Sequence, residues 1–316
     1  MAPPHRLGLL SIDRELPDRP ATPAERRWFA TYRAAARVAQ VLPLSLANAA
    51  AEISGLVFTL TGRRMRSNIT AALRRVCPEL EGLALQRAVE RAFASYGRYW
   101  MECFRAPVIP RAELEAHMSY EGFDNLYAGL ARGKGVILAL PHLGSWDYGG
   151  AWLAAVGHPM TVVAEPARPP EMFEWFARMR RSMGLTVVPL DRHAGTVVLR
   201  TLRAGGLVGL LSDRNLGRGG VEVDLFGRTT LPAGPATLAL RGGAALMTAA
   251  VYTRPRGQHL AVIGPPIVAD RQGHLRDDVT RVTKAMAADL ETLIRRAPEQ
   301  WHLFQPNWPD DPGYGA

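Results

Sequence analysis

A histidine and a carboxylate lie five residues apart in the segment from Leu138 to Asp147. An imidazole held by a carboxylate is fixed in one tautomer and can accept a proton from a hydroxyl group. On one continuous helix, five residues rotate by about 140°, so His142 and Asp147 would point apart. With His142 in a turn and Asp147 in the first turn of a following helix, the side chains can converge. The segment therefore predicts a general base, His142, oriented by Asp147.

The elements around this pair must hold it at the edge of a sheet. The apolar run 135–140 predicts a buried strand ending at Pro141, after which the chain turns through Gly144, with Ser145 as a suitable helix N-cap. Open α/β sheets bind ligands at the carboxyl ends of their strands. Because chance alone produces this His–Asp spacing about one time in three in such a chain, the position after a strand matters more than the spacing.

Short apolar runs alternate with stretches of helical spacing after residue 110. This alternation predicts an α/β fold with a mainly parallel central sheet flanked by helices. A last amphipathic helix carries an apolar stripe from Val279 to Leu293. The predicted strands are Gly135–Leu140, Met160–Ala164, Leu185–Leu190, Leu207–Leu211 and Met247–Tyr252.

The first third of the chain differs from the rest. We expect a mobile Pro-rich tail over 1–22, a helical membrane-associating portion over 23–107, and an α/β core over 108–316 that is continuous with the helices. Arginines flank apolar helices that carry Trp and Tyr, a pattern typical of proteins in the lipid headgroup layer; an ordinary helical subdomain with solvated arginines is the alternative. Polar residues interrupt the apolar run 38–62, which favours an interfacial or buried helical pair over a membrane crossing.

Composition excludes several classes of protein. The net charge of +9 comes from 38 basic residues, all arginine except Lys134 and Lys284, and fits either a compositional bias or affinity for phosphates and anionic membranes. Cys77 and Cys103 give neither a disulfide framework nor metal-ligand spacing. No Walker, dinucleotide or His-Glu-x-x-His motif is complete, and no nucleic-acid-binding motif occurs, so we expect no metal and no nucleic-acid partner.

Several segments, in order, carry a family resemblance. The motif from His142 to Asp147 resembles the His-x4-Asp motif of lipid acyltransferases related to the lipid A lauroyl acyltransferases, and within them the branch that acylates phosphatidylinositol mannosides. The resemblance covers most of the chain. Its supporting segments are Arg66–Asn68, Ser95–Trp100, Phe104–Pro107, Val163–Glu165, Arg180, Gly184, Asp213–Arg214, Gly220–Gly227, Pro232–Pro235 and Trp301–Pro306.

The resemblance implies roles for particular residues. His142 would be the catalytic base and Asp147 its orienting partner. Arg180 would hold either a glutamate that lines the site, Glu165, or the substrate, and Asp213 stands where the mannoside enzymes carry a glutamate near the histidine. The substrate-binding residues implied are Glu165, Arg180, Asp213, Arg214, Thr230 and Gly234. Without the resemblance, Glu165 and Asp213 are also compatible with helix caps or surface ion pairs. Arg180 is likewise compatible with a solvated basic face.

The function implied is transfer of a fatty acyl chain, palmitoyl by expectation, from acyl-CoA to a mannose hydroxyl of phosphatidylinositol mannosides. Acyl-CoA is then a co-substrate, no further cofactor is needed, and the partners are a glycolipid acceptor and the anionic surface on the cytoplasmic face of the cell membrane. No Gly-x-Ser-x-Gly elbow occurs, which agrees with direct transfer without a covalent enzyme intermediate.

Two alternatives remain open from the sequence. One is an acyltransferase of the same superfamily that acts on another glycolipid or on a lysophospholipid. The other is a lipid-binding protein without catalysis, which would need neither His142 nor Asp147. Other histidines and two late tryptophans show no partner pattern and are interpreted as structural, packing or exposed: His5, His117, His158, His193, His259, His274, His302, Trp301 and Trp308.

Overall fold

The computed structural model describes residues 20–216 and 219–314, and a seven-stranded sheet lies at their centre. Its strand order is β1-β9-β8-β2-β5-β3-β4, and adjacent strands run parallel except β8 and β9. The strands are β1 (Met118–Glu121), β2 (Val136–Leu140), β3 (Met160–Ala164), β4 (Thr186–Pro189), β5 (Leu207–Leu211), β8 (Ala245–Thr253) and β9 (His259–Ile263).

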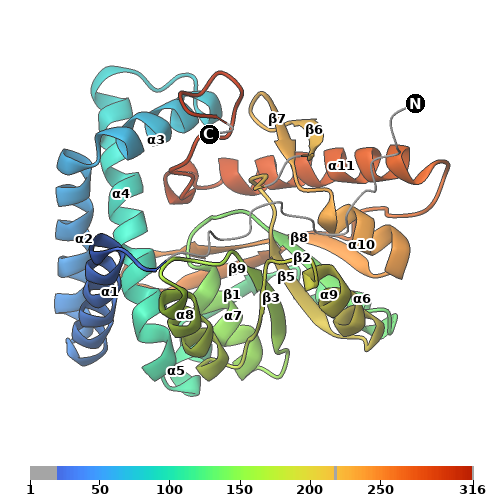
Figure 1. The fold of residues 1–316 in the computed structure, drawn as a ribbon, viewed down its shortest axis with the longest axis horizontal. Helices are drawn as coiled ribbons and strands as arrows, with labels where there is room; N and C mark the ends of the chain where they lie inside the picture. The colour runs from blue at the N-terminus through green and yellow to red at the C-terminus, as the bar shows by residue number, and fades with distance from the viewer. Residues whose placement is uncertain (1–19, 217–218, 315–316) are drawn as a thin grey trace.

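Helices cover both faces of this sheet, which is why its central strands are apolar throughout. In β2, Ile137 and Ala139 pack into one core cluster, whereas Val136, Leu138 and Leu140 pack into another. The first face is covered by α9 (Ala194–Arg203), α10 (Gly234–Gly242) and α11 (Leu275–Arg295), and the second by α5 (Arg111–Ala116), α6 (Phe123–Ala131) and α7 (Trp146–Ala155). Figure 1 shows α10 and α11 on the opposite side of the sheet from α7.

The predicted α/β class and mainly parallel sheet are confirmed, and the five predicted strands correspond to β2, β3, β4, β5 and β8. Strands β1 and β9 were not predicted, nor was the separate antiparallel hairpin of β6 (Val221–Asp224) and β7 (Arg228–Leu231). These pieces are four or five residues long, and the polar residues in β1, β6 and β7 break the apolar run on which the prediction depended.

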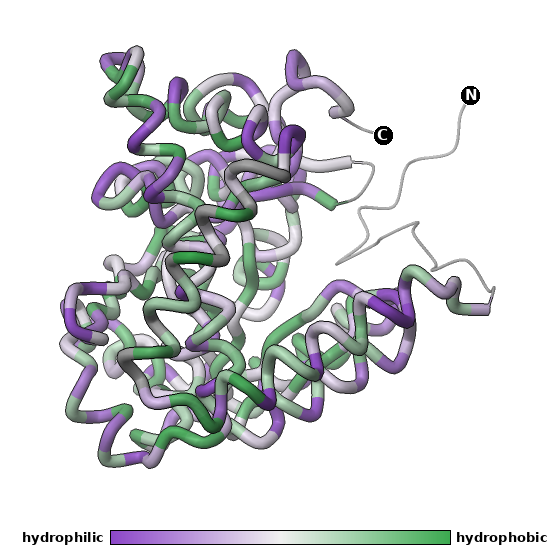
Figure 2. The backbone as a smooth tube through the Cα atoms, turned by 90° about the vertical axis from the view of Figure 1, so that its left-hand side faces the viewer, coloured by the Kyte–Doolittle hydropathy of each residue, from purple (hydrophilic) through white to green (hydrophobic). Residues whose placement is uncertain are grey.

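The N-terminal helices α1 (Pro23–Val41), α2 (Leu44–Thr61) and α3 (Arg63–Val76) pack along the long helix α4 (Gly82–Arg105), with α8 (Pro170–Ser182) nearby. Thr22 caps α1 in a capping box with Glu25. The predicted tail falls almost wholly on 1–19, outside the described residues. Within the described part of the chain, no helix has both the length and the apolar character needed to cross a membrane. Figure 2 faces this side and shows apolar and polar residues interspersed along the helices.

The C-terminal segment returns across the carboxyl edge of the sheet after the short 3-10 helix η3 (Pro298–Gln300). Trp301 and Trp308 are each 1% exposed, so the segment is part of the core. The buried side chain of Asn68 on α3 donates to the carbonyl of Phe304 at 2.8 Å, which ties the segment to the N-terminal helices. Two further 3-10 helices are η1 (Ala106–Val108) and η2 (Pro255–Gly257).

Candidate functional site

The turn that carries His142 is fixed by backbone hydrogen bonds to distant segments. Gly144 donates to the carbonyl of Gln300 at 2.9 Å, and Ser145 donates to Val251 at 2.8 Å. Gly144 has a φ of +60°, and a Cβ there would lie 2.0 Å from the Val251 oxygen, so only glycine allows this approach. Ser145 is the residue before α7, as predicted, but its hydroxyl makes no capping hydrogen bond.

A buried carboxylate holds His142, and it belongs to Asp213. The Nδ1 of His142 lies 2.7 Å from Oδ1 of Asp213, and the backbone amide of His142 donates to Oδ2 at 2.9 Å. The indole of Trp301 donates to the same Oδ2 at 2.7 Å. Burial alone would raise the pKa of Asp213, but the electrostatic attraction to the His142 imidazole and these hydrogen bonds outweigh it and hold that pKa below its ordinary value. The carboxylate is therefore ionised at neutral pH.

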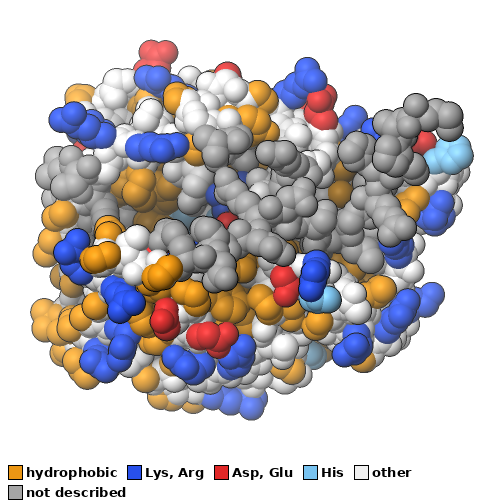
Figure 3. Space-filling view, viewed as in Figure 1, with side chains coloured by type: hydrophobic (Ala, Val, Ile, Leu, Met, Phe, Trp, Pro, Cys, Tyr) orange, Lys and Arg blue, Asp and Glu red, His pale blue; other side chains and the backbone are white. Residues whose placement is uncertain are grey.

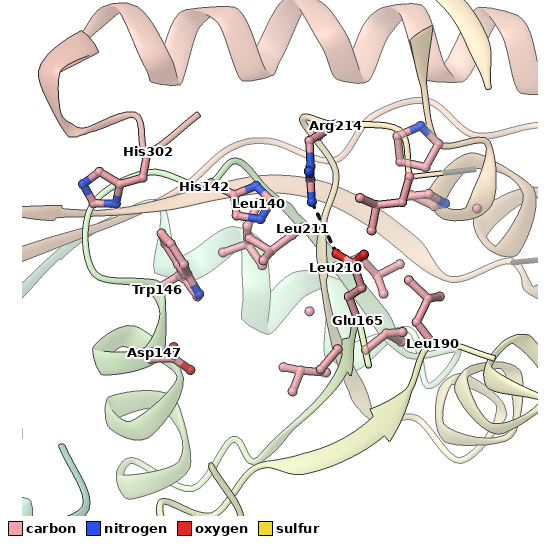
Figure 4. Close-up of a pocket in the computed structure, with 18 of the residues that line it drawn as sticks. Leu140, His142, Trp146, Asp147, Glu165, Leu190, Leu210, Leu211, Arg214 and His302 are labelled. Carbon is pink, nitrogen blue, oxygen red and sulfur yellow. Dashed lines mark hydrogen bonds and ion pairs between the residues drawn. The ribbon is translucent and has the colours of Figure 1, made fainter. Parts of the chain in front are cut away.

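The sequence-based expectation for Asp147 is corrected by this geometry. Its carboxylate has no hydrogen bond to His142; it accepts from Arg180 at 2.7 and 2.9 Å and from the hydroxyl of Tyr99 at 2.9 Å. The thiol of Cys103 lies 3.5 Å away. Because Asp147 sits in the first turn of α7, it points toward α4 and α8 instead of back to the turn. In Figure 4 the carboxylate lies beyond Trp146, away from the His142 ring.

The Asp147–Arg180 ion pair is largely shielded from water, with the Asp147 side chain 3% and the Arg180 side chain 19% exposed. Burial would raise the pKa of Asp147, but the guanidinium of Arg180 and its hydrogen bonds lower it. Burial and the nearby Asp147 carboxylate raise the pKa of both Tyr99 and Cys103 well above their usual ranges, so both stay protonated donors. Arg180 thus holds Asp147 instead of Glu165, and both Arg180 and Asp147 line the cavity beside His142.

Trp146 contacts the His142 ring, and His302 packs against Trp146. Trp146 meets the His142 ring edge-on, with ring centroids 5.5 Å apart, and stacks on Tyr99 at 4.0 Å. The ring centroids of His302 and Trp146 are 5.9 Å apart, and the backbone amide of His302 donates to the carbonyl of His142 at 2.7 Å. The Nε2 of His302 lies 3.0 Å from the hydroxyl of Ser95. Burial, then repulsion from His142 and Arg98, lowers the pKa of His302 to about 3, so this imidazole is neutral.

We expect His302 to make the protein acid-sensitive. The unfolded chain binds a proton there near the ordinary pKa of 6.5, whereas the folded chain does so only near pH 3, so stability falls as the pH drops from about 6.5. Between pH 7.5 and 5, His302→Gln is expected to remove about 2 kcal/mol of this loss in the free energy of unfolding. Urea unfolding at both pH values measures it, with the exposed His274→Gln as control. Equal pH dependence in wild type and H302Q would contradict the expectation.

The other predicted site residues separate into two groups. Glu165, which follows β3, pairs with Arg214 at 3.4 Å, and both line the cavity beside His142, as Figure 4 shows. Gly234, at the start of α10, lines it too. Thr230 instead lies in β7, where its hydroxyl accepts from the Asn215 amide at 3.3 Å, and it does not line the cavity.

A cavity of about 400 Å³ opens at the carboxyl edge of the sheet and contains this site. That volume lies in the usual range for small-molecule sites. One part is apolar, and the other collects the polar and charged groups around His142. Its apolar lining includes Leu140, Met160, Val162, Leu185, Leu190, Gly209, Leu210 and Leu211. The arrangement can bind an aliphatic chain with its polar end beside an imidazole that is able to accept a proton.

Sequence reasoning missed Tyr99, Trp301 and His302 as site residues. Both segments that carry them, Ser95–Trp100 and Trp301–Pro306, supported the family resemblance, but they lie about 40 and 160 residues from His142. Aromatic residues in two distant segments gave no partner pattern that periodicity could detect. Among the described residues, no group of three or more His, Cys, Asp or Glu side chains is arranged to hold a metal ion.

Comparison with known proteins gives the class. Residues 20–309 match the family described as bacterial lipid A biosynthesis acyltransferase, and the chain belongs to that family. It is 37% identical to a phosphatidylinositol mannoside acyltransferase of Mycolicibacterium smegmatis, over 70% of this chain and 72% of the relative. It is 40% identical to that of Mycobacterium tuberculosis over 68% of each. A lipid A biosynthesis acyltransferase of Haemophilus influenzae is 23% identical over 76% of this chain and 74% of its own. The resemblance stated from the sequence is confirmed.

Proposed function

We propose that this acyltransferase moves a fatty acyl chain from acyl-CoA to a mannose hydroxyl of phosphatidylinositol mannosides. The observation that carries the proposal is the pair of His142 and buried Asp213 at the mouth of an apolar cavity, in a chain 37 to 40% identical to acyltransferases named for that acceptor. The donor and its palmitoyl chain are the expectation from the sequence, and they fit a cavity with an apolar part and a polar mouth.

In the proposed reaction, His142 is the general base. Because Nδ1 of His142 faces Asp213, Nε2 is the nitrogen left to take the proton of the acceptor hydroxyl. The hydroxyl oxygen attacks the thioester carbonyl carbon, a C–O bond forms, and the C–S bond then breaks. The imidazolium returns its proton to the leaving thiolate, and ionised Asp213 stabilises the imidazolium in between. The free thiolate is a good leaving group, so no covalent enzyme intermediate is required.

The remaining site residues take supporting roles in this proposal. Arg214 and Glu165 stand at the polar mouth, where the guanidinium suits an anionic or sugar group of either substrate. Gly234 allows a ligand to approach the start of α10 closely. Asp147 and Arg180 hold the first turn of α7, which carries Trp146 against the His142 ring.

The helices over 23–107 are proposed to rest on the cytoplasmic face of the membrane as a peripheral or monotopic surface. Val41 and Ile53 are 80% and 63% exposed, and Leu46 shares the face of Ile53 because the two lie seven residues apart on α2. Figure 3 shows hydrophobic side chains gathered at the lower left, over the ends of α1 and α2, with basic side chains among them. Exposed arginines of α1 and α3 suit anionic headgroups: Arg26, Arg27, Arg33, Arg37, Arg63, Arg64 and Arg66.

Product analysis by mass spectrometry tests the proposed function. Purified protein and His142→Ala receive palmitoyl-CoA together with a phosphatidylinositol mannoside, a lysophospholipid or buffer alone. We expect an acylated mannoside from the wild type and none above background from the variant. Acylation of the lysophospholipid alone would favour the other acceptor class. Lipid association by both proteins, with no product from either, would favour a lipid-binding protein without catalysis.

A further inference from the structure

Most of the apolar lining of the cavity comes from one face of three neighbouring strands. Residues two apart in a strand share a face, and the register pairs Gly209 of β5 with Leu138 of β2 and with Val162 of β3. The cavity-lining residues on this face are Leu140, Met160, Val162, Gly209 and Leu211, and Leu185 covers them before β4. No charged side chain belongs to this set, so an aliphatic chain is the occupant that suits it.

Met160 lies at the far end of this channel from His142. His142 follows the carboxyl end of β2, whereas Met160 is the first residue of β3 and stands level with Val136. The backbone of Met160 lies two strand spacings across and about four residues down the sheet from Leu140. Its side chain reaches back toward Leu140, since both residues line a cavity of about 20 Å³.

A second, small apolar cavity adjoins the main one at Met160, Leu140 and Trp146. It holds about 20 Å³, and these three side chains line both cavities. Met160 is only 5% exposed, so its side chain is a partition between the two spaces and not a surface group. A shorter side chain at residue 160 would join them.

Gly209 sets the position of that partition. A Cβ at residue 209 would lie 2.5 Å from Sδ and 2.9 Å from Cε of Met160, closer than real contacts allow. The absence of a side chain at Gly209 therefore admits the Met160 thioether to this position. Since Gly209 itself lines the main cavity, an added methyl group would also take volume directly from the channel.

We propose that Met160, seated against Gly209, is the end wall of the acyl channel and determines the length of the acyl chain that this protein accepts. The proposal rests on the proposed acyl transfer. It predicts opposite effects of two substitutions. Met160→Ala opens the channel into the second cavity and shifts the preferred chain about two carbons longer; Gly209→Ala shifts it shorter. One methylene in an apolar pocket changes kcat/KM about tenfold or more, so the shifts are measurable.

The test measures kcat/KM for even-numbered acyl-CoAs from lauroyl to arachidoyl, below their micelle-forming concentrations, with wild type, M160A and G209A. Met118→Ala is the matched control, because Met118 belongs to the same core cluster with similar burial and lines neither cavity. Opposite shifts in M160A and G209A, with none in M118A, support the proposal. Wild-type chain preference in active M160A and G209A overturns it.

Acyl-CoA binding, measured by isothermal titration calorimetry on the same four proteins, separates this proposal from the proposed function. If no acyl transfer occurs but the acyl-CoA that binds best has a longer chain in M160A and a shorter one in G209A, the role of Met160 as end wall is supported and the proposed function is contradicted. If acyl transfer occurs with an unchanged chain-length preference in both variants, the proposed function is supported and the role of Met160 as end wall is contradicted.

Discussion

Replacing Asp213 by asparagine is expected to lower kcat for acyl transfer by about 10³-fold, close to the effect of replacing His142 itself. The asparagine amide keeps the size of the side chain but removes the charge that stabilises the imidazolium. It also presents a donor where His142 Nδ1 and the Trp301 indole both need an acceptor. Steady-state kinetics at saturating palmitoyl-CoA and mannoside measure the fall in kcat. Because the Asp213 carboxylate acts in the transition state, KM should change little.

Asp147→Asn is the comparison that makes the result specific. It applies the same chemical change to the other carboxylate of this region, which contacts Arg180 and Tyr99 but not His142. In the folded fraction of this variant, kcat should fall by no more than about tenfold, because only the seating of Trp146 is disturbed. A larger loss of kcat in D147N than in D213N would contradict the assignment of Asp213 as the partner of His142.

The contrast between these two carboxylates also shows what the local sequence does not predict, namely which carboxylate contacts His142. Spacing and the preceding apolar run predicted that His142 leaves a strand and Asp147 enters a helix, and both are so. Which carboxylate reaches His142 depends on strand order, because β5 lies next to β2 and thus brings Asp213, just beyond its end, beside His142. Local spacing carries no information on strand order. The family resemblance did point to Asp213, because it aligned this residue with a glutamate near the histidine.

The fold was predictable to the extent that burial is uniform along an element. Strands β2, β3 and β5 are apolar at nearly every residue because both of their faces are covered, so a run of apolar residues detects them. Strand β1 reads Met-Ser-Tyr-Glu and lies at the sheet edge, where three of its four side chains are exposed. Its identity as a strand comes from pairing with β9, about 140 residues later, which no local pattern encodes.

The C-terminal residues of the site could not be predicted from the sequence for a related reason. His302 and Trp301 lie in a segment without a long regular element, and its conformation is set by contacts with the His142 turn and with α3. The bridge between Leu143 and Trp301 is a single pair, too short to leave a periodic pattern. Aromatic residues of α4 did follow a helical pattern, but the pattern alone predicted a membrane-facing surface, whereas Tyr99 is buried against the site.

The ion pair of Asp147 and Arg180 leads to the second large effect, on stability. D147N is expected to lower the free energy of unfolding by about 3 to 5 kcal/mol, because it leaves the buried guanidinium of Arg180 without its counter-charge. Arg180→Met removes the other partner, leaves the carboxylate of Asp147 to Tyr99 and Cys103, and should be similarly destabilising. Urea unfolding at pH 7.5, followed by tryptophan fluorescence and by circular dichroism, measures both losses.

The double variant D147N/R180M tests the cause of those losses. If each single loss arises from an uncompensated buried charge, removing both charges should restore much of the stability, and the double variant should lose less than the sum of the single losses by more than about 1 kcal/mol. The exposed pair of Arg228 and Glu222 supplies the control cycle, in which coupling should stay below about 1 kcal/mol. Additive losses at Asp147 and Arg180 would mean that packing around α7, and not the buried ion pair, holds Trp146 against His142.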